Sequence, residues 1–324
     1  MKKLLVIFLL IISMVLSACS SNETLLNQYT QDVNLGNNIT DLELNKAEGF
    51  ASNLAVVDKD SPDYNKSYEI YSPIALLVDS TTNEIIIQKN VHDKAYPASI
   101  TKVLTSMLAI KYGDANSKRK AGEEIIITEE NVVTCAYRVG DDITFDIALH
   151  GALIRSGNDA AAFLATFVNE SQTEFVKLMN DEAKKIGATN SNFTNSHGLT
   201  DENHYTTAYD LYLIYREALK SDYFRSVIGK HTFKGEFQRT TSYNTYRIPC
   251  EYITTNPFFT DDATAPDNVT VLGGKSGYTE AAKRCYILHA SAENGHEYIA
   301  IVLKAENKEK LATDLMYLLN CIPK

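Results

Sequence analysis

The chain of 324 residues has few cysteines and prolines, and its charge is not predominantly positive. Five cysteines and seven prolines are too few for a disulfide-dense scaffold or a collagen-like chain. With 31 Lys and Arg against 41 Asp and Glu, the formal net charge is −10 at pH 7. This charge repels phosphate, so we expect no nucleic-acid partner. The chain is 44% hydrophobic and 22% charged, which is typical of a globular protein with a sizeable core.

The longest apolar run lies at the N-terminus, where Lys2 and Lys3 precede Leu4–Ile12. The run is too short for a spanning helix, which needs about 20 residues, and has the form of an export signal. The next residues, Leu16-Ser17-Ala18-Cys19, resemble the lipobox of bacterial lipoproteins. That resemblance implies loss of residues 1–18, lipidation of Cys19, and an exported protein anchored to the outer face of the bacterial cell membrane. An ordinary secretory signal with a chance cysteine is the alternative.

Four further cysteines, Cys135, Cys250, Cys285 and Cys321, remain in the expected mature chain. An exported protein can form disulfides, and four cysteines allow three full pairings, among which the sequence does not choose. Alternatively, they are small buried hydrophobic residues. No C-x-x-C pair occurs, so neither a zinc site nor a thioredoxin-like site is indicated. We expect no metal and no cofactor.

The mature chain divides into a polar spacer at 19–66, with little apolar periodicity, and one domain at 67–324. The strand-like runs lie at both ends of the domain: Ile74–Val78, Glu84–Gln88, Val269–Lys275, Arg284–Ala292 and Tyr298–Leu303. The helix-like segments are Pro97–Tyr112, Ile143–Arg155, Asp159–Val168, Gln172–Ile186, Thr207–Leu219 and Lys308–Leu319. This order predicts an α+β fold with an antiparallel sheet built from both ends of the chain.

The first motif that could carry chemistry is Ser99-Ile100-Thr101-Lys102, at the start of a predicted helix. Its i, i+3 spacing places a hydroxyl and an amine on one helical face, where a neutral lysine could take the proton of a serine nucleophile. The motif alone is weak, because a helix cap with a solvated lysine has the same pattern. Ser117–Lys120 has the same form, but we predict that it lies in a polar turn with no apolar helix after it.

Two further motifs follow along the chain. Ser156-Gly157-Asn158 lies between predicted helices, where its hydroxyl and amide could relay a proton and hold a peptide carbonyl; Ser242-Tyr243-Asn244 has the same form. Lys275-Ser276-Gly277 ends a predicted strand, where the cation and hydroxyl suit a carboxylate and the glycine leaves room for a peptide at the strand edge. Alone, these motifs are equally typical of a helix-breaking loop and a solvated strand end.

Taken together, the order of the three motifs and their helix, loop and strand contexts resemble the penicillin-binding protein and serine β-lactamase superfamily. The segments Asn195–Leu199 and His204–Ala208 are similar to those of low-molecular-weight D-alanyl-D-alanine carboxypeptidases. The resemblance covers residues 68–324. It implies a five-stranded antiparallel sheet flanked by helices plus a helical subdomain, with the active site between the sheet edge and the helices.

The resemblance also implies a serine peptidase that removes the terminal D-alanine from peptidoglycan stem peptides. Ser99 would attack the carbonyl between the last two D-alanines, and Lys102 would accept its proton. Ser156 and Asn158 would relay protons and hold the substrate backbone, and water would then cleave the acyl-enzyme. β-Lactam antibiotics, which mimic D-Ala-D-Ala, would trap Ser99 as a long-lived ester.

On the binding side, the resemblance implies that Lys275 and Ser276 hold the terminal carboxylate and that Gly277 leaves room for the peptide. The backbone N–H groups of Ser99 and Tyr278 would form the oxyanion hole. Ser276 occupies a position where many relatives have threonine; both residues supply a hydroxyl.

Two other functions fit parts of the pattern. A β-lactamase would need a deacylating glutamate between the second and third motifs; Glu170, Glu174 and Glu182 are the candidates, but they lie in or near a predicted helix. A cell-wall lipoprotein that binds or senses β-lactams without turnover is the other alternative. His197 and His204 lie in the family-like stretch, and we interpret them as scaffold because lysine would be the base.

Overall fold

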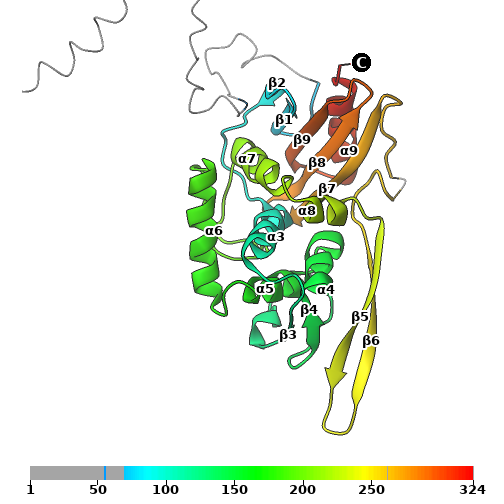
Figure 1. Cartoon of the computed structure of the whole chain (residues 1–324). Coiled ribbons are helices and arrows are strands. Elements are labelled where there is room, and N and C mark those ends of the chain that lie inside the picture. Colours follow the sequence, from blue (N-terminus) through cyan, green and yellow to red (C-terminus); the bar gives the residue numbers. More distant parts are fainter. Residues whose placement is uncertain (1–54, 56–68, 261, 324) are drawn as a thin grey trace, which may run out of the picture. The chain divides into compact units, whose positions relative to one another are not determined.

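The computed structural model describes Ala55, residues 69–260 and residues 262–323. The predicted signal peptide, Cys19 and nearly all of the predicted spacer lie outside these residues. The described part has an α+β fold, as predicted, with a five-stranded antiparallel sheet in the order β2-β1-β9-β8-β7 (Figure 1). Its strands are β1 (Ile74–Asp79), β2 (Glu84–Lys89), β7 (Val269–Thr279), β8 (Lys283–Ala292) and β9 (Glu297–Ala305).

The first and last strands of the domain lie side by side in this sheet, because β1 pairs antiparallel with both β2 and β9. Successive side chains of a strand point to opposite faces, and β1 is buried on both. Ile74 and Leu76 belong to the larger apolar core, while Ala75 and Leu77 belong to a smaller one. A strand of this kind needs a covering layer on each side, which predicts helices on both faces of the sheet.

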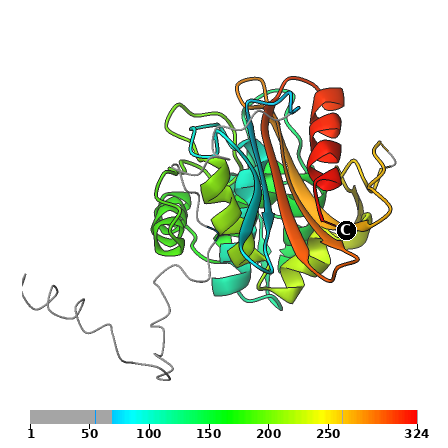
Figure 2. The same ribbon diagram turned by 90° about the horizontal axis from the view of Figure 1, so that it is seen from above.

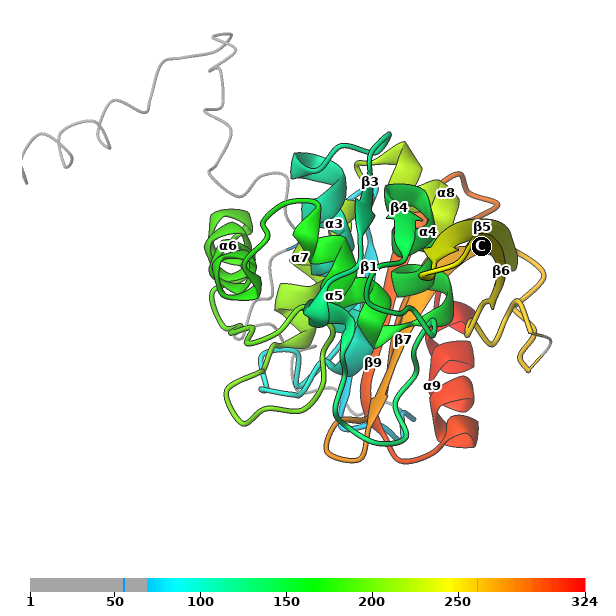
Figure 3. The same ribbon diagram turned by 90° about the horizontal axis from the view of Figure 1, so that it is seen from below.

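One face of the sheet is covered by α9 (Lys308–Asn320), and the opposite face by helices from the middle of the chain (Figures 2 and 3). Of these, α7 (Ala208–Ala218) and α8 (Asp222–Ile228) contact the sheet. The other helices from the middle of the chain are α3 (Thr101–Tyr112), α4 (Phe145–His150), α5 (Asn158–Thr166) and α6 (Gln172–Ile186). α3 contacts α5, α6, α7 and α8. The helix that carries the first motif is therefore enclosed on several sides.

Local sequence signals set the limits of α6 and α7. The Ser171 hydroxyl accepts a hydrogen bond from the Glu174 N–H at the start of α6, and Gly187, with φ of +97°, ends the helix as predicted. The Thr207 hydroxyl caps α7 in the same way. Such caps satisfy N–H groups that have no partner inside the helix.

The predicted helix at 143–155 is only partly correct. Asp142–Thr144 form strand β4, and the Thr144 hydroxyl then caps α4. After α4, residues Gly151–Arg155 form a π-helical turn that ends at Ser156 with φ of +67°. A π turn holds an extra residue and often occurs at functional sites. Here it carries the chain directly into the second motif.

A second sheet, in the order β3-β4-β5-β6, is absent from the sequence prediction. Its remaining strands are β3 (Lys118–Lys120), β5 (Thr232–Thr240) and β6 (Thr245–Ile253), and Figure 1 shows the β5–β6 hairpin as a long ribbon. Gly235 and Pro249 obscure the strand pattern, since both are rare inside sheets. Pro249 is tolerated because β6 is an edge strand. The predicted polar turn at Ser117–Lys120 is also wrong, because Lys118–Lys120 pair with β4.

The structure also bears on the cysteines and on membrane insertion. Cys135, Cys250 and Cys285 carry free thiols, and Cys285 is buried, so none of the full pairings of four cysteines is present among the described residues. Burial raises the pKa of Cys285 to about 11. Within the described ranges, no helix combines the length and apolarity that crossing a bilayer requires.

Candidate active site

Ser99 and Lys102 lie where a short 3₁₀ turn, Ala98–Ile100, continues into α3. The single helical turn between them places Lys102 Nζ 2.9 Å from Ser99 Oγ. Lys102 is fully buried, whereas Ser99 is half-buried and accessible to a substrate. The spacing read from the sequence therefore gives a hydroxyl and an amine in direct contact.

Lys102 has two other oxygen partners. Its Nζ lies 2.8 Å from Asn158 Oδ1 and 2.6 Å from the carbonyl oxygen of His197. An ammonium group has three donors and no acceptor, and here it donates to all three oxygens. After loss of one proton, two N–H bonds remain for Asn158 and His197, and the lone pair faces Ser99 Oγ.

The surroundings favour this neutral form of Lys102. Burial, followed by the positive charge of Lys275, lowers the pKa of Lys102 well below its usual value; the negative charge of Asp159 opposes the shift. Desolvation penalises the charged form of a buried lysine, and a neighbouring like charge adds to this penalty. The arrangement thus shifts Lys102 toward the free amine, which is the form that a lysine base requires.

The His197 carbonyl is a partner of Lys102 that sequence reasoning missed, because it treated His197 only as scaffold. Asn195 Oδ1 accepts hydrogen bonds from the N–H groups of His197 (3.3 Å) and Gly198 (2.6 Å), and these bonds hold the turn. Gly198 has φ of +89°, and a Cβ atom there would lie 1.9 Å from the Ala98 carbonyl oxygen. Only glycine fits this close approach, and the Asn-x-x-Gly spacing was the signal that could have indicated it.

The second motif lies in the turn before α5. Ser156 adopts the left-handed conformation, and the Asn158 N–H donates to the Val133 carbonyl at 2.9 Å. The Asp159 carboxylate accepts bonds from the backbone N–H groups of Cys135, at 2.8 and 2.9 Å, and Tyr137, at 3.2 Å. Burial nevertheless raises the pKa of Asp159. The segment at 133–137 and the second motif are therefore held together.

Lys275 reaches the second motif from strand β7, at the sheet edge. Its Nζ donates to Ser156 Oγ and to the Ser276 carbonyl, both at 2.8 Å, and the side chain is almost fully buried. Burial lowers the pKa of Lys275 to about 7. The three motifs thus converge through hydrogen bonds: Ser99 and Asn158 on Lys102, and Ser156 on Lys275.

The strand edge next to Lys275 lies very close to the first motif. A Cβ atom on Gly277 would be 2.8 Å from the Pro97 carbonyl oxygen and 3.1 Å from the Ser99 backbone nitrogen. The Tyr278 side chain is 46% exposed; its hydroxyl bonds Glu280, and the Arg284 guanidinium lies 4.7 Å from its ring centroid. The glycine therefore lets the strand edge approach the serine, while the tyrosine ring has partners of its own.

Ser117, in the motif that resembles Ser99–Lys102, and Glu182 have other partners. The Ser117 hydroxyl donates to the Asp114 carbonyl at 2.5 Å. Glu182 accepts bonds from Lys111 and Lys185, both at 2.6 Å, and its pKa falls to about 2. Lys111 follows Lys102 by nine residues along α3, which at 1.5 Å per residue is about 14 Å. Glu182 thus lies at the far end of that helix, and nothing in the structure favours it as a deacylating group.

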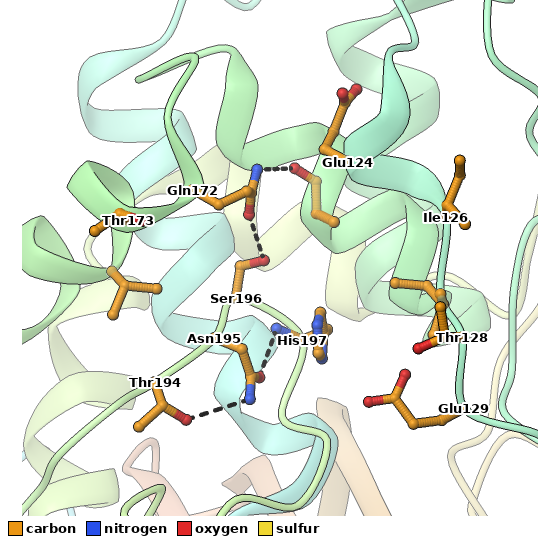
Figure 4. A pocket seen from close by; sticks show the side chains of 13 residues that line it. Glu124, Ile126, Thr128, Glu129, Gln172, Thr173, Thr194, Asn195, Ser196 and His197 are labelled. Atoms are coloured by element: carbon orange, nitrogen blue, oxygen red, sulfur yellow. Dashed lines mark hydrogen bonds between the residues drawn. The ribbon is translucent and has the colours of Figure 1, made fainter.

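A cavity of about 320 Å³ lies beside the turn that holds Lys102. Figure 4 shows Asn195, Ser196 and His197 on one side of it and Thr128 and Glu129 on another. Across the described ranges, no group of three or more His, Cys, Asp or Glu side chains is placed to hold a metal ion. The chemistry of the site as described rests on hydroxyls, amides and two lysines.

Comparison with known proteins agrees with this geometry. Residues 59–307 match the D-alanyl-D-alanine carboxypeptidase family of peptidases. The chain is 31% identical over 241 residues to D-alanyl-D-alanine carboxypeptidase DacF of Bacillus subtilis, which covers 73% of this chain and 58% of that protein. It is 30% identical over 230 residues to the D-alanyl-D-alanine endopeptidase of Escherichia coli, and this match covers 70% of this chain and 69% of that protein.

The fold also matches a solved structure. The crystal structure of a Streptomyces DD-transpeptidase superposes with a TM-score of 0.71 and 21% identity, covering 79% of this chain and 98% of that one. The fold is therefore that of this DD-transpeptidase. With three quarters of its length matched by the family model, the chain belongs to the D-alanyl-D-alanine carboxypeptidase family.

Proposed function

We propose that this protein is a serine-type D-alanyl-D-alanine carboxypeptidase, which removes the terminal D-alanine from peptidoglycan stem peptides through an acyl-enzyme on Ser99. The observation that carries the proposal is the contact of a fully buried lysine amine, Lys102 Nζ, with Ser99 Oγ at 2.9 Å. A serine is a weak nucleophile until a base takes its proton. A lysine that is neutral near pH 7 can act as that base.

In the acylation step, Lys102 takes the Ser99 proton while Ser99 Oγ attacks the carbonyl between the two D-alanines. The backbone N–H groups of Ser99 and Tyr278 stabilise the negative charge on the carbonyl oxygen. Ser156, which bonds Lys275, passes its hydroxyl proton to the leaving amine and regains a proton from the Lys102 ammonium, so Lys102 returns to the neutral amine. The C–N bond then breaks and D-alanine leaves, with the acyl group esterified to Ser99.

In the deacylation step, water attacks the ester while neutral Lys102 takes one of its protons, and Lys102 then gives this proton to Ser99 Oγ as the ester bond breaks. The Asn158 amide holds Lys102 through Oδ1 at 2.8 Å, and its NH₂ group remains a donor for a substrate carbonyl. Lys275 and the Ser276 hydroxyl hold the terminal carboxylate. β-Lactams acylate the same serine, and their ester persists because the leaving group stays tethered to the acyl chain.

The setting of this activity follows from the N-terminal sequence. The Lys-flanked apolar run and the Leu-Ser-Ala-Cys segment support export and lipid attachment at Cys19. A lipid chain binds membrane with about 0.8 kcal/mol per buried CH₂. The catalytic domain would then act on the wall from the outer face of the cell membrane.

The test uses the chain purified without residues 1–18. It should release D-alanine from a peptide ending in D-Ala-D-Ala in steady state, and benzylpenicillin should add one acyl group, which peptide mapping places on Ser99. Ser99→Ala should lower D-alanine release and acylation by benzylpenicillin by about 10³-fold or more. The control Ser117→Ala, in the other motif of the same form, should retain both activities. Labelling that survives in Ser99→Ala would exclude Ser99 as the nucleophile.

The same preparation separates the alternatives. Acylation without D-alanine release would indicate a β-lactam sensor, and rapid turnover of nitrocefin would indicate a β-lactamase. Incorporation of labelled palmitate by the full chain, and its loss in Cys19→Ala, tests the lipid anchor independently of catalysis.

A further inference from the structure

The Ser276 hydroxyl has a partner that none of the three motifs contains. Thr255 Oγ1 lies 2.6 Å from Ser276 Oγ, and either hydroxyl can be the donor. Thr255 is exposed and Ser276 is half-buried, so the pair is accessible from solvent. Ser276 adjoins Lys275, whose Nζ bonds the Ser276 carbonyl. The Lys275 amine therefore contacts the backbone of the residue that carries one of the two hydroxyls.

The segment that carries Thr255 is tied down on both sides. Just before it, the Thr254 N–H donates to the His231 carbonyl at 3.0 Å and continues the β5–β6 pairing. Just after it, buried Asn256 accepts a bond from the Phe258 N–H at 3.0 Å. The Phe259 ring stacks on His231, with centroids 4.2 Å apart. Thr255 is thus held at a fixed place against β7.

A serine in this position needs such a partner more than a threonine would. The branched Cβ of threonine restricts χ1, whereas a serine hydroxyl turns more freely between rotamers. A hydroxyl that accepts one hydrogen bond can donate its own proton to an anion, and such chains strengthen each bond through polarisation. With Thr255 donating to Ser276, the Ser276 proton is free for a carboxylate oxygen.

We propose that Thr255 is a positioning residue for the substrate's terminal carboxylate: it fixes the Ser276 hydroxyl and forms with it a two-hydroxyl relay beside Lys275. The inference rests on the proposed function of the same site and extends it to a residue outside the three motifs. Because the relay donates to the carboxylate, it affects binding of the substrate's C-terminal group. It does not affect proton transfer between Ser99 and Lys102.

The test compares release of D-alanine from a D-Ala-D-Ala peptide with release of D-alaninamide from the same peptide amidated at its C-terminus. Thr255→Val should lower kcat/KM for the free acid by about fivefold, mainly through KM, since a single hydrogen bond is removed. The value for the amide should stay within twofold of wild type. Thr255→Ser, which keeps the hydroxyl, should behave as wild type.

A matched control lies at the far end of the same hairpin, where Thr240 Oγ1 and Thr245 Oγ1 are 3.0 Å apart. Thr240→Val removes the same kind of hydroxyl pair there and should leave kcat/KM unchanged for both the free acid and the amide. In a Ser276→Thr background, the branched side chain restricts the rotamer of its own hydroxyl. Adding Thr255→Val to this background should therefore lower kcat/KM for the free acid by less than twofold.

Each outcome decides the proposal. The relay would be contradicted if Thr255→Val lowered kcat/KM equally for acid and amide, or lowered it for neither. It would also be contradicted if the loss of kcat/KM were the same with Ser276 kept and with Ser276 replaced by threonine. Failure of the proposed function is distinct, because the unaltered protein would then neither release D-alanine nor react with benzylpenicillin.

Discussion

The two ends of helix α3 carry the same residue type in opposite states. Lys102, at the N-terminal end, is fully buried beside Lys275, and its pKa lies well below the usual value. Lys111, at the C-terminal end, is half-exposed and bonds Glu182, and this hydrogen bond raises its pKa. At each end, the helix dipole shifts the lysine pKa the same way as the surroundings do, since it disfavours a cation at the N-terminus and favours one at the C-terminus. The comparison shows that the surroundings, and not the residue type, make a lysine a base.

The largest effect should come from removing the base while keeping a cation. Lys102→Arg should lower the rate of acylation by benzylpenicillin by about 10³-fold, because a guanidinium stays protonated near neutral pH. Lys111→Arg makes the same change at the other end of α3 and should leave the rate unchanged. A near wild-type rate in Lys102→Arg would show that Ser99 loses its proton through another group.

The next effect concerns the turn that fixes Lys102. Gly198→Ala should lower the free energy of unfolding by about 3 kcal/mol or more, because a Cβ would overlap the Ala98 carbonyl oxygen. Acylation per folded molecule should fall as well, because the His197 carbonyl moves away from the base. Urea unfolding and the acylation rate are the measurements.

Gly187→Ala is the control for this prediction. Gly187 also has a positive φ, of +97°, but the nearest atom to its added Cβ is Leu213 Cδ1 at 3.6 Å. Gly187→Ala should lower the free energy of unfolding by about 1 to 2 kcal/mol through backbone strain alone, and its acylation rate should equal that of the wild type. Equal behaviour of the two variants would mean that the turn at 195–199 does not position the base.

The pH dependence of kcat/KM should separate the two buried lysines. Activity should rise with pH as Lys102 loses its proton and fall again near pH 7, where Lys275, with its pKa lowered to about 7, loses the charge that holds the carboxylate. Lys275→Arg keeps a cation at all these pH values and should remove the falling limb at a modest cost in rate. A falling limb that persists in Lys275→Arg would assign it to another group.

The smallest activity effect is expected at the outer end of α3. Glu182→Gln should destabilise the protein at neutral pH without changing acylation. The folded-state pKa of Glu182 is about 2, against 4.5 ordinarily, so its contribution is present in full above pH 4.5 and is lost as pH falls toward 2. Urea midpoints of the variant and the wild type should therefore converge at low pH; a constant difference would exclude the ion pairs as its cause.

Much of the fold could be predicted because its signals are local. The apolar run of β1 and the limits of α6 are read from neighbouring residues, and both are confirmed. The β5–β6 hairpin was missed, since Gly235 and Pro249 interrupt its pattern; it also pairs with the distant strand β4, through Gln238 and Asp142. The same limit explains the error at 143–144, where pairing with β3 overrides the predicted helix.

For the site, the sequence by itself determined which side chains are present, and at what spacing: a hydroxyl and an amine one helical turn apart, a Ser-Gly-Asn turn, and a lysine two residues before a glycine. The predicted strand ended at Lys275, whereas β7 continues to Thr279. Only the tertiary structure decided their chemical states. Burial and the nearby Lys275 lower the pKa of Lys102, and a carbonyl 95 positions away fixes its amine. Desolvation and charge act through space, between segments that the chain order separates. A motif therefore states which groups are available, and the fold decides which of them carries the proton.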